Sequence, residues 1–374
     1  MKVALVHDYL KEYGGAERVL ETLVEMWPDA PIYTAYLNLE GLGKHGVRVK
    51  NWSARGGIRT SWLQRLPLAN KLVSPLRVIA PAIFAGFDLS EFDVIISSCN
   101  IYFAKAVKTR QDQLHLSYIH TPPRYLYGLT TSFNYHKHFW TRIGGEIINH
   151  FLRINDFKVS QQPDILIANS KNVAGRINKF YRRDSEIIYP PIEVEQFKQA
   201  ITPGEGGYFL SVSRLVKGKG VDLIIQACSE LNLPLKVVGS GPLRSELEKL
   251  AGKTVEFIGQ VEDRELPGIY ASAGALIIAA EDEDFGITPV EAMAAGTPVV
   301  ALKKGGYLET VISGKTGEFF DQATPESLKK ILQSFDYTKY KKSDLTAQAE
   351  KFSKSQFKDK ILDLVAKYYP KVVK

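Results

Sequence analysis

The sequence of 374 residues has only two cysteines and no apolar run long enough to cross a bilayer. Cys99 and Cys228 lie far apart and lack the spacing of metal ligands, which argues against a disulfide and against a zinc site. The missing apolar run argues against an integral membrane protein. Asp8 interrupts the first apolar stretch too early for a signal peptide. We therefore expect a protein of the reducing cytoplasm, with no bound metal.

Acidic residues are absent between Glu40 and Asp88, a stretch that contains eight lysines and arginines. Residues 1–195 hold 24 basic and 18 acidic side chains and residues 196–374 hold 24 and 23, so most of the net charge of +7 lies in the first half. The basic residues of the stretch are Lys44, Arg48, Lys50, Arg55, Arg59, Arg65, Lys71 and Arg77.

Two interpretations of this basic stretch stay open. Bulky apolar side chains are mixed among the cations: Trp52, Trp62, Leu63, Leu66 and Leu68. This composition suits an anionic membrane surface contacted through residues 41–87. Each cation near the headgroups adds about 1 kcal/mol. The protein would then be peripheral on the inner face of the plasma membrane. The alternative is a solvated basic face above ordinary core residues. Nucleic acid is not expected, because no binding motif accompanies the charge.

Short apolar runs that predict strands alternate with periodic segments that predict helices. The predicted strands are Val3–His7, Ile32–Tyr36, Val47–Trp52, Val94–Ser98, Leu114–His120, Ile165–Asn169 and Ile187–Tyr189 in the first half, and Tyr208–Ser213, Leu235–Gly239, Val255–Ile258, Ala275–Ala280, Val299–Leu302 and Gly317–Phe320 in the second. The predicted helices include Ala16–Met26, Asn172–Tyr181, Val221–Leu231, Leu243–Ala251 and Lys354–Tyr369.

This alternation predicts an α/β fold of two doubly wound, Rossmann-like domains with parallel sheets. Chain breakers at Pro190-Pro191 and at residues 204–207 place the boundary between them, which gives domains 1–195 and 196–374. In such folds ligands bind at the carboxyl ends of the strands.

The segment from Glu281 to Val300 carries the clearest candidate site. Glu283 and Glu291 flank a turn that leads into a predicted helix, where Thr288 and Glu291 fit a capping box and Pro289 takes the first helical position. Amides at a helix start beside a carboxylate form a nucleotide-phosphate site with a hydroxyl anchor. The alternative is that Glu291 only caps its helix while Glu283 is solvated.

Two further clusters follow predicted strands, and His120 forms a third, described below. Arg214, Lys217 and Lys219 lie among glycines after Tyr208–Ser213, where cations can neutralise a diphosphate. Gly14 and Gly15 follow the first strand and permit backbone amides to approach an anion. The alternatives are solvated surface for the cations and a plain turn for the glycines. This is not the G-x-G-x-x-G pattern, which argues against a nicotinamide enzyme.

His120 leaves the strand Leu114–His120 into a loop stiffened by Pro122 and Pro123. A histidine there is expected to face the ligand-binding edge of the sheet. The alternative is a structural histidine that is hydrogen-bonded to backbone.

Together these clusters resemble retaining glycosyltransferase family 4, the glycosyl transferases group 1, which have the GT-B architecture. The matching elements are Glu283 with Glu291, Arg214 with Lys219, and the landmarks Ile167–Ser170, Tyr189–Pro191, Val238–Pro242, Phe257–Gly259 and Gly305-Gly306. The opening Val6–Arg18 looks most like bacterial O-antigen mannosyltransferases. Asp284 departs from the pattern, since many relatives have glycine there.

The resemblance implies two domains facing across a cleft, with the last helix, about 354–369, crossing back to the first. The first domain would bind the acceptor and the second the nucleotide sugar. It also implies transfer of a hexose, mannose favoured, from a nucleoside diphosphate sugar to a saccharide hydroxyl with retention and without a metal. GDP-sugars are the favoured donor, UDP-sugars the next, and a lipid-linked saccharide the expected acceptor. Cell-surface polysaccharide or glycolipid assembly is the implied setting.

The implied catalytic residues are His120, Arg214, Lys219 and Glu283. The implied donor-binding residues are Gly14, Gly15, Arg214, Lys219, Glu283, Phe285, Gly286, Ile287, Thr288 and Glu291. Arg214 and Lys219 would hold the diphosphate, Glu291 the ribose and Glu283 the donor sugar, while His120 would orient that sugar.

Other functions stay open. Asp282 and Asp284 could be an Asp-x-Asp metal pair, although that pair belongs to another architecture. A non-catalytic sugar-nucleotide sensor or scaffold, or a GT-B epimerase, would keep the same fold. A phosphorylase would need a pyridoxal lysine, which the sequence does not identify. A hydrolase would place two carboxylates at the glycosidic bond rather than beside phosphate-binding elements.

Overall fold

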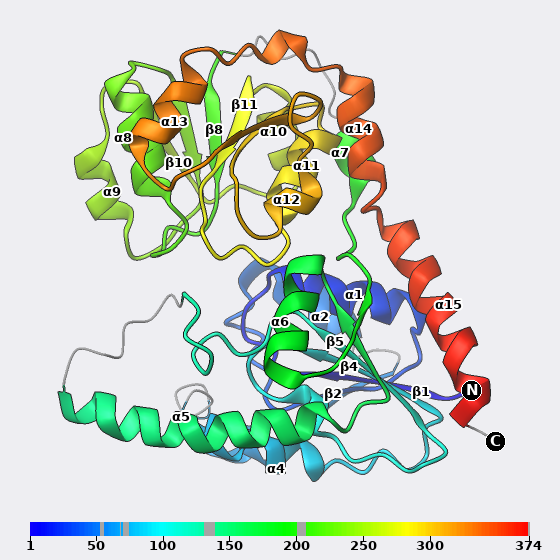
Figure 1. The fold of residues 1–374 in the computed structure, drawn as a ribbon. Helices are drawn as coiled ribbons and strands as arrows, with labels where there is room; N and C mark the ends of the chain where they lie inside the picture. Colours follow the sequence, from blue (N-terminus) through cyan, green and yellow to red (C-terminus); the bar gives the residue numbers. More distant parts are fainter. Residues whose placement is uncertain (53–55, 68, 70–74, 131–138, 200–206, 373–374) are drawn as a thin grey trace. The chain divides into compact units, whose positions relative to one another are not determined.

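A computed structural model describes residues 1–52, 56–67, 69, 75–130, 139–199 and 207–372. It divides into two compact units (Figure 1). Unit 1 comprises Met1–Leu129, Phe133–Pro191 and Ser355–Lys374, and unit 2 comprises Thr130–Ser132 and Ile192–Lys354. Arg55, Leu68, Lys71 and residues 204–206, which the sequence analysis uses, lie outside the described residues.

Unit 1 contains a parallel sheet of seven strands in the order β3-β2-β1-β4-β5-β6-β7. Its strands are β1 (Val3–His7), β2 (Ile32–Thr34), β3 (Ile58–Thr60), β4 (Val94–Cys99), β5 (Leu114–Ile119), β6 (Ile165–Ala168) and β7 (Glu186–Ile187). In β1 the residues Val3 and Leu5 enter one core and Ala4 and Val6 enter another. Both faces of the sheet are therefore buried, as in doubly wound folds.

The predicted strand Val47–Trp52 is wrong, because these residues form the helix α2 (Gly46–Trp52). Val49 and Trp52 are buried whereas Val47 is 71% exposed. A spacing of three residues between buried side chains is typical of a helix face. The strand that follows β2 in the sequence is instead β3, at the edge of the sheet, which the sequence analysis missed.

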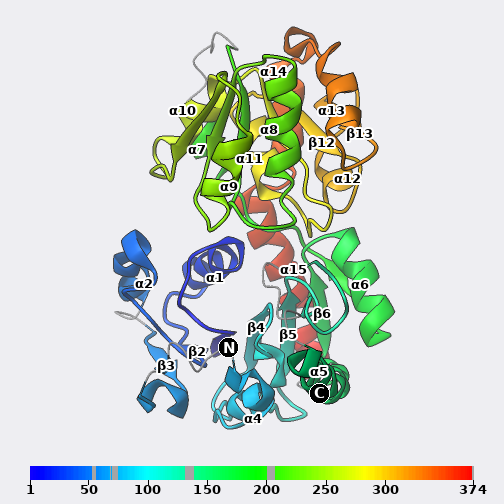
Figure 2. The ribbon, with the colours of Figure 1, turned by 90° about the vertical axis from the view of Figure 1, so that its left-hand side faces the viewer.

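Helices cover the two faces of this sheet. One face of the sheet, called the α1 face below, is covered by α1 (Gly15–Met26), α2 and α15 (Lys354–Val372). The α5 face is covered by α4 (Ala80–Ala85), α5 (Phe139–Ser160), α6 (Lys171–Tyr181) and the 3₁₀ turns η2 (Trp62–Arg65), η3 (Pro75–Ile79) and η4 (Ala104–Ala106). α4 and α5 lie side by side (Figures 1 and 2). Both contact η4.

A buried ion pair holds α5 against the face of the sheet that this helix covers. Lys105 Nζ lies 2.6 Å from Asp156 Oδ1, and both side chains are almost fully buried. Lys105 also donates to the Tyr181 hydroxyl, while the Tyr127 hydroxyl donates to Asp156. Burial opposes charge on Lys105, but Asp156 outweighs it and raises the pKa of the ammonium group. The pair therefore determines which side of α5 faces inward.

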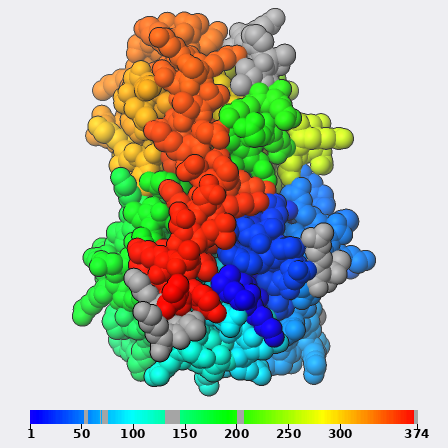
Figure 3. Space-filling model, turned by 90° about the vertical axis from the view of Figure 1, so that its right-hand side faces the viewer, coloured from blue at the N-terminus to red at the C-terminus, as the bar shows by residue number. Residues whose placement is uncertain are grey.

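The helix α15 belongs to unit 1 although it follows unit 2 in the chain. Its residues Phe357, Ile361, Leu364 and Val365 are part of the core on the α1 face. Lys358 also pairs with Glu25 of α1 at 2.9 Å. Figure 3 shows this C-terminal helix against the N-terminal part of the chain.

Unit 2 contains a parallel sheet of six strands in the order β10-β9-β8-β11-β12-β13. Its strands are β8 (Phe209–Val212), β9 (Leu235–Val238), β10 (Val255–Gly259), β11 (Ala275–Ile278), β12 (Val299–Leu302) and β13 (Gly317–Phe320). α8 (Val221–Glu230), α9 (Arg244–Leu250) and α13 (Pro325–Leu332) contribute to one core with the strands. α7 (Val194–Lys198), α10 (Leu266–Ala271), α11 (Ile287–Ala294) and α14 (Lys342–Glu350) pack with one another.

The chain passes between the units at two places that lie beside each other within unit 2. Ile192 N donates to Phe352 O at 3.1 Å and Lys354 N donates to Ile192 O at 3.0 Å. Both segments thus join in one short parallel bridge.

The two cysteines form no disulfide with each other. Cys99 and Cys228 are free and buried in the cores of different units. Burial raises the pKa of each thiol to about 12. Within the part of the chain that the structure describes, no helix has the length and hydropathy that a membrane span needs.

Candidate functional site

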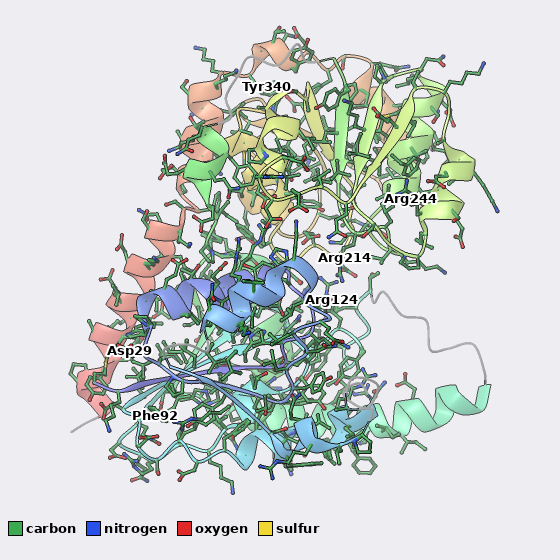
Figure 4. The ribbon with its side chains drawn as sticks, turned by 180° about the vertical axis from the view of Figure 1, so that it is seen from behind. Asp29, Phe92, Arg124, Arg214, Arg244 and Tyr340 are labelled. Carbon is green, nitrogen blue, oxygen red and sulfur yellow. The ribbon has the colours of Figure 1, made fainter. Side chains whose placement is uncertain are left out.

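In unit 2 the direction of strand order reverses between β8 and β11, which are neighbours in the sheet. Chain connections leave these two strands toward opposite sides, so the loops at their carboxyl ends separate and leave room for a ligand. The loop after β8 contains Arg214 and Lys219, and the loop after β11 contains Glu283. Figure 4 labels Arg214 in this loop. The topology therefore brings together two clusters that lie about 65 residues apart in the sequence.

Lys219 and Glu283 form the centre of this arrangement. Lys219 Nζ donates to Glu283 Oε2 at 2.7 Å. Their side chains are 29% and 21% exposed, so the pair is half-buried and open to solvent. A pair of this kind contributes little to stability and leaves a positioned cation accessible to a competing anion.

Glycines allow the loop around Arg214 to pack tightly. A Cβ atom on Gly239 would lie 1.9 Å from Ser213 O, and one on Gly241 would lie 2.3 Å from Leu215 O. The Gly-Ser-Gly turn after β9 therefore lies directly against the loop after β8. Arg214 itself is exposed at this point.

The capping box predicted for α11 is wrong. The helix begins at Ile287 with Gly286 as its N-cap, and no side chain caps it. Gly286 has φ +92°, a left-handed value that favours glycine, and this starts the helix two residues before the predicted first turn. Pro289 is consequently the third helical residue. The free amides at the helix start belong to Ile287, Thr288 and their neighbours, as a phosphate site requires.

Glu291 lies in the interior rather than at the helix start. It is 2% exposed, and its Oε2 accepts from the Tyr270 hydroxyl at 3.1 Å. Phe285 is also buried and packs edge-on against Phe352, with ring centroids 5.3 Å apart. Phe285 therefore anchors the turn through its buried ring.

The residues Gly305 and Gly306 hold the turn that carries Glu283. A Cβ atom on Gly305 would lie 2.5 Å from Glu283 O, and one on Gly306 would lie 2.3 Å from Phe285 Cα. Gly306 N donates to Glu283 O at 3.0 Å. Tyr307 follows directly; burial first and the Glu283 carboxylate second raise the pKa of its hydroxyl. The position of Glu283 is thus set by backbone contact with a loop 22 residues further along.

The Asp-x-Asp alternative has a specific observation against it. Asp282 Oδ2 accepts from the Thr130 amide at 2.9 Å and also from the Thr130 hydroxyl. One of the two carboxylates therefore already has protein donors. The described residues contain no group of three or more His, Cys, Asp or Glu side chains arranged to hold a metal ion.

In unit 1 the strand order reverses between β1 and β4. Gly14 is the N-cap of α1 and Gly15 its first residue. Gly14 N donates to Glu17 Oε2 at 2.8 Å, which fixes the start of the helix. Gly15 is exposed, so its amide can be approached from solvent.

His120 lies at the end of a chain of buried side chains that crosses this switch point. Its Nε2 is 2.8 Å from Ser98 Oγ, which is 3.1 Å from His7 Nδ1. His7 Nε2 lies 3.4 Å from Glu17 Oε1. The series of side-chain contacts therefore runs from His120 to Glu17, the residue whose carboxylate accepts from the Gly14 amide. Burial, and then the nearby His7, lower the pKa of His120 to about 3.

The sequence analysis missed His7, Ser98 and Glu17. His7 and Ser98 are signalled only by polarity at the ends of strands β1 and β4, and Glu17 only by its place in the first turn of the helix after Gly14. Asn169 also supports His120, because its Nδ2 donates to His120 O at 2.9 Å. His120 is therefore a neutral, firmly positioned imidazole.

Asp8 is a second residue that the sequence analysis used only as a break in an apolar run. Its carboxylate accepts from four backbone amides of the loop after β4, at 2.7 or 2.8 Å: Asn100, Ile101, Tyr102 and Ala104. Asp8 is 3% exposed. It joins the ends of β1 and β4 and shapes the loop between them.

The basic stretch 41–87 does not form one face. Arg48 lies on α2, on the α1 face, and pairs with Glu21 at 3.5 Å. Arg59 pairs with Glu91 at 3.6 Å. Arg65 is exposed in η2, and Arg77 stacks on Tyr125 with 4.6 Å to the ring centroid, both on the α5 face. Lys44 and Lys50 lie with α2 on the opposite side.

Part of unit 2 is similar in sequence to known glycosyltransferases. Residues 193–352 match the family model of glycosyl transferases group 1. An uncharacterized glycosyltransferase of Methanocaldococcus jannaschii is 28% identical over 211 residues, which cover 55% of this chain and 59% of the relative. A D-inositol 3-phosphate glycosyltransferase of Streptomyces scabiei is 27% identical over 214 residues, 49% of this chain and 48% of the relative. The chain thus spans about half the length of these curated relatives.

Solved structures match over the whole chain. The Anabaena protein HepE, in complex with UDP-glucose, has a TM-score of 0.68 and 18% identity, covering 98% of this chain and 100% of that one. Sucrose-phosphate synthase from Thermosynechococcus elongatus has a TM-score of 0.69 and 16% identity, covering 99% and 100%. These likenesses establish the fold, two parallel-sheet Rossmann-like units of the GT-B type. Residues 193–352 of the chain are thus similar to the glycosyl transferases group 1, and the whole chain shares the fold of these structures.

Proposed function

We propose that the protein is a glycosyltransferase that moves a hexose from a nucleoside diphosphate sugar to a hydroxyl group of a saccharide. The observation that carries the proposal is the Lys219–Glu283 pair at the switch point of unit 2, 2.7 Å apart and partly open to solvent. It lies in the family-matched segment, and the glycine-capped start of α11 follows the same turn as Glu283. A diphosphate would compete with Glu283 for the ammonium group and release the carboxylate for sugar hydroxyls.

In this proposal the residues of unit 2 bind the donor. Arg214 and Lys219 hold the diphosphate and stabilise charge on the departing group. The amides of Ile287 and Thr288, beside Gly286 and the Phe285 backbone, add the field of the helix N-terminus. Glu291, whose carboxylate the Tyr270 hydroxyl holds in place, would accept from the ribose hydroxyls. Its burial favours a fixed rather than a mobile anchor.

Unit 1 would bind the acceptor and contribute Gly14, Gly15 and His120 to the same reaction. Gly15, exposed at the start of α1, suits an approach of its amide to the donor phosphate, while Gly14 shapes the turn. His120, whose pKa is lowered to about 3, stays neutral at physiological pH and orients the sugar by hydrogen bonding. A neutral imidazole neither repels nor neutralises the charge that develops at the anomeric carbon.

We infer retention at the anomeric carbon without a metal ion. The described residues of the two switch points offer no carboxylate placed as an obvious covalent nucleophile, and Lys219 with Arg214 supplies the positive charge that a metal would otherwise bring. The departing phosphate would assist attack on the same face, with the protein supplying position and electrostatics. Transfer should then persist in the presence of EDTA.

GDP-mannose is the proposed donor on the resemblance of residues 6–18, and UDP-sugars come second. A UDP-glucose complex of HepE, a structure of the same fold, keeps UDP-sugars in the test. The proposed acceptor is a lipid-linked saccharide of cell-surface polysaccharide or glycolipid assembly. That acceptor would place the protein at the cytoplasmic side of the plasma membrane.

The test is a panel of GDP- and UDP-sugars with the purified full chain. Thermal unfolding should identify one donor that raises the melting temperature, because a ligand that binds only the native state stabilises it. The same donor should then be consumed with a saccharide acceptor, and proton NMR of the product should show the donor's anomeric configuration.

Other outcomes would favour the alternatives. A donor that binds but is neither transferred nor hydrolysed would indicate a sensor or scaffold. A donor whose sugar is epimerised without an acceptor would indicate an epimerase. Inverted product would remove the retaining mechanism while leaving sugar transfer intact.

A further inference from the structure

Four buried side chains of unit 1 form the Glu17–His120 series: Glu17, His7, Ser98 and His120. The three distances along the series are 3.4, 3.1 and 2.8 Å. Each residue is at most 8% exposed, so the donors and acceptors have to match one another within the protein. The position of one hydrogen in such a series therefore decides the position of the next.

The hydrogens can be placed by starting at Glu17, because a carboxylate accepts hydrogen bonds and has none to donate. Glu17 Oε2 accepts from Gly14 N at 2.8 Å, and Glu17 Oε1 faces His7 Nε2 at 3.4 Å. Within the described residues no other group bonds to His7 Nε2, so this nitrogen has to hold the hydrogen. In a ring with one proton, His7 Nδ1 is then an acceptor.

Ser98 passes this order on to His120. Its hydroxyl has one hydrogen, which points to His7 Nδ1 at 3.1 Å, because that nitrogen offers only a lone pair. The Ser98 oxygen is then left to accept from His120 Nε2 at 2.8 Å. Burial lowers the pKa of His120 to about 3, so its ring has a single proton at neutral pH. That proton is on Nε2, and Nδ1 is a hydrogen-bond acceptor.

The acceptor nitrogen of His120 is the one that the protein leaves open. The ring is held through Nε2 by Ser98, and the backbone is held by Cys99 O and by the Asn169 side chain. In the part of the chain that the structure describes, nothing bonds to His120 Nδ1. His120 directly follows the carboxyl end of β5, the edge of a parallel sheet where ligands bind. A ligand at this edge therefore meets an acceptor instead of a donor.

A second buried pair of serine and histidine shows what the series adds. Ser97 Oγ lies 2.9 Å from His115 Nε2, and Ser97 is the neighbour of Ser98 in β4, so the two hydroxyls are on opposite faces of the sheet. Among the described residues, no carboxylate is hydrogen-bonded to the Ser97 hydroxyl or to the His115 ring. The tautomer of His115 is therefore independent of Glu17, which makes this pair a matched control.

We propose that Glu17, through the two side chains between them, holds His120 in the tautomer with its proton on Nε2 and so presents Nδ1 as an acceptor to a sugar hydroxyl. Glu17, His7 and Ser98 are positioning residues, since they act on the sugar only through His120. The role toward a sugar rests on the proposed function, whereas the order of the hydrogens does not. Because Glu17 also accepts from Gly14 N, one carboxylate positions both groups that unit 1 contributes.

Nitrogen-15 NMR of the full chain, labelled at its seven histidines, tests the order of the hydrogens without donor or acceptor. A ring nitrogen with a hydrogen and one with a lone pair have well-separated chemical shifts, so each tautomer is read directly. The rings are assigned through their bonds to the assigned backbone. At pH 7.5 the natural chain should have one proton on His7 and one on His120, in both rings on Nε2.

Glu17→Gln is the decisive variant, because it keeps the shape of the side chain and replaces an acceptor by a donor. The amide oxygen can still accept from Gly14 N, and the amide nitrogen then donates to His7 Nε2. Every hydrogen of the series should turn round, which moves the proton of both rings to Nδ1, while His115 keeps its tautomer. In a Ser98→Ala background the link is cut, so Glu17→Gln should change the tautomer of His7 alone.

Kinetics connects the tautomer with the proposed transfer. Glu17→Gln and Ser98→Ala should each lower kcat/KM by about three- to tenfold, the contribution of one neutral hydrogen bond to the substrate. The two losses should not add in the double variant, because both act through His120. The control Ser97→Ala removes the neighbouring buried hydroxyl and should leave kcat/KM unchanged.

Three results would overturn the proposal: a natural chain with the His120 proton on Nδ1, a His7 ring with protons on both nitrogens at pH 7.5, or an unchanged His120 tautomer in Glu17→Gln. The first two are read from the natural chain, so poor folding of a variant cannot hide a failure. If the natural chain transfers no sugar from any donor, the proposed function fails, while the NMR signals still decide the order of the hydrogens. If it transfers sugar but the His120 tautomer does not follow Glu17, only this inference fails.

Discussion

The two switch points have the same topology and opposite chemistry. In unit 2 the centre is an ion pair, Lys219 with Glu283, partly open to solvent. In unit 1 the centre is a chain of buried hydrogen bonds that ends at His120, whose pKa is lowered to about 3. Strand order therefore decides where a ligand can bind, whereas the side chains at the strand ends decide what kind of group is bound. A charged, exchangeable pair suits a phosphate, and a buried hydrogen-bonded network that ends in a neutral imidazole suits a sugar.

The largest expected effect tests the charged side of this comparison. Lys219→Ala should lower kcat/KM for transfer by about 10²–10³-fold, because it removes charge at the departing phosphate. The melting temperature should stay nearly constant, since the pair is half exposed. The control is Lys217→Ala, an exposed cation of the same loop. Equal losses in both variants would show that the loop supplies only general positive charge.

The next effect tests how firmly unit 1 is built. Asp8→Ala should lower the free energy of unfolding by about 3 kcal/mol, because four backbone amides lose a charged acceptor in a buried place. Asp112→Ala, at an exposed carboxylate of the same unit, is the control and should cost little. Chemical denaturation measures both. A small effect at Asp8 would mean that water replaces the carboxylate.

The dependence of stability on pH should differ between the two units. Burial lowers the pKa of both His115 and His120 to about 3, below the value of about 6.5 expected in the unfolded chain. Below pH 6.5 only the unfolded state takes up these protons, so each histidine should cost about 1.4 kcal/mol of stability per pH unit between 6.5 and 3. Above pH 6.5 neither should contribute.

All seven histidines lie within residues 1–150, and the segment Ile192–Lys354 of unit 2 has none. Hydrogen exchange at pH 7.5 and 5.5, corrected for intrinsic rates, should therefore show lost protection in the strands of unit 1 first. Equal loss in both sheets would contradict the assignment of acid sensitivity to His115 and His120.

The smallest expected effect concerns the loop that positions Glu283. Gly305→Ala should destabilise the protein by about 1–3 kcal/mol and raise the KM for the donor, because Gly305 has φ +57° and its Cβ would lie 2.5 Å from Glu283 O. Gly314→Ala is the control, since φ is +74° there but no atom lies within 4 Å of the added Cβ. The control should lose stability without any change in donor KM.

Sequence patterns predicted much of this structure. Both parallel sheets follow from the alternation of apolar runs and helical periods, which are local signals. The roles proposed for Arg214, Lys219 and Glu283 stay predictions, made because these residues follow predicted strands. The strand predicted for Val47–Trp52 failed because six residues with valines at 47 and 49 are too few to distinguish the period of a strand from that of a helix. The helix start at Ile287 failed because a left-handed glycine replaced the side-chain cap that the pattern suggested.

Non-local contacts explain what the sequence could not give. The strands β1 and β4 are about 90 residues apart in the sequence but neighbours in the sheet. Only this pairing brings together the partners in the hydrogen bonds of His7, Glu17, Ser98 and Asp8. The backbone contact of Gly305 with Glu283 is of the same kind. The helix α5 was also missed, because it carries large apolar residues on its exposed side, Ile147, Phe151 and Ile154, as well as on its buried side, and so shows no clear period.

The placement of α15 has a consequence for synthesis. Phe357, Ile361, Leu364 and Val365 complete a core whose other members begin at Val3. Each such side chain contributes about 1.5–3 kcal/mol when it is fully buried. The ribosome delivers these residues only after all of unit 2 has been made, so the unit that starts first finishes last. The nascent first half must wait with one face of its sheet incompletely covered, and a stop codon placed after Lys354 would leave it in that state permanently.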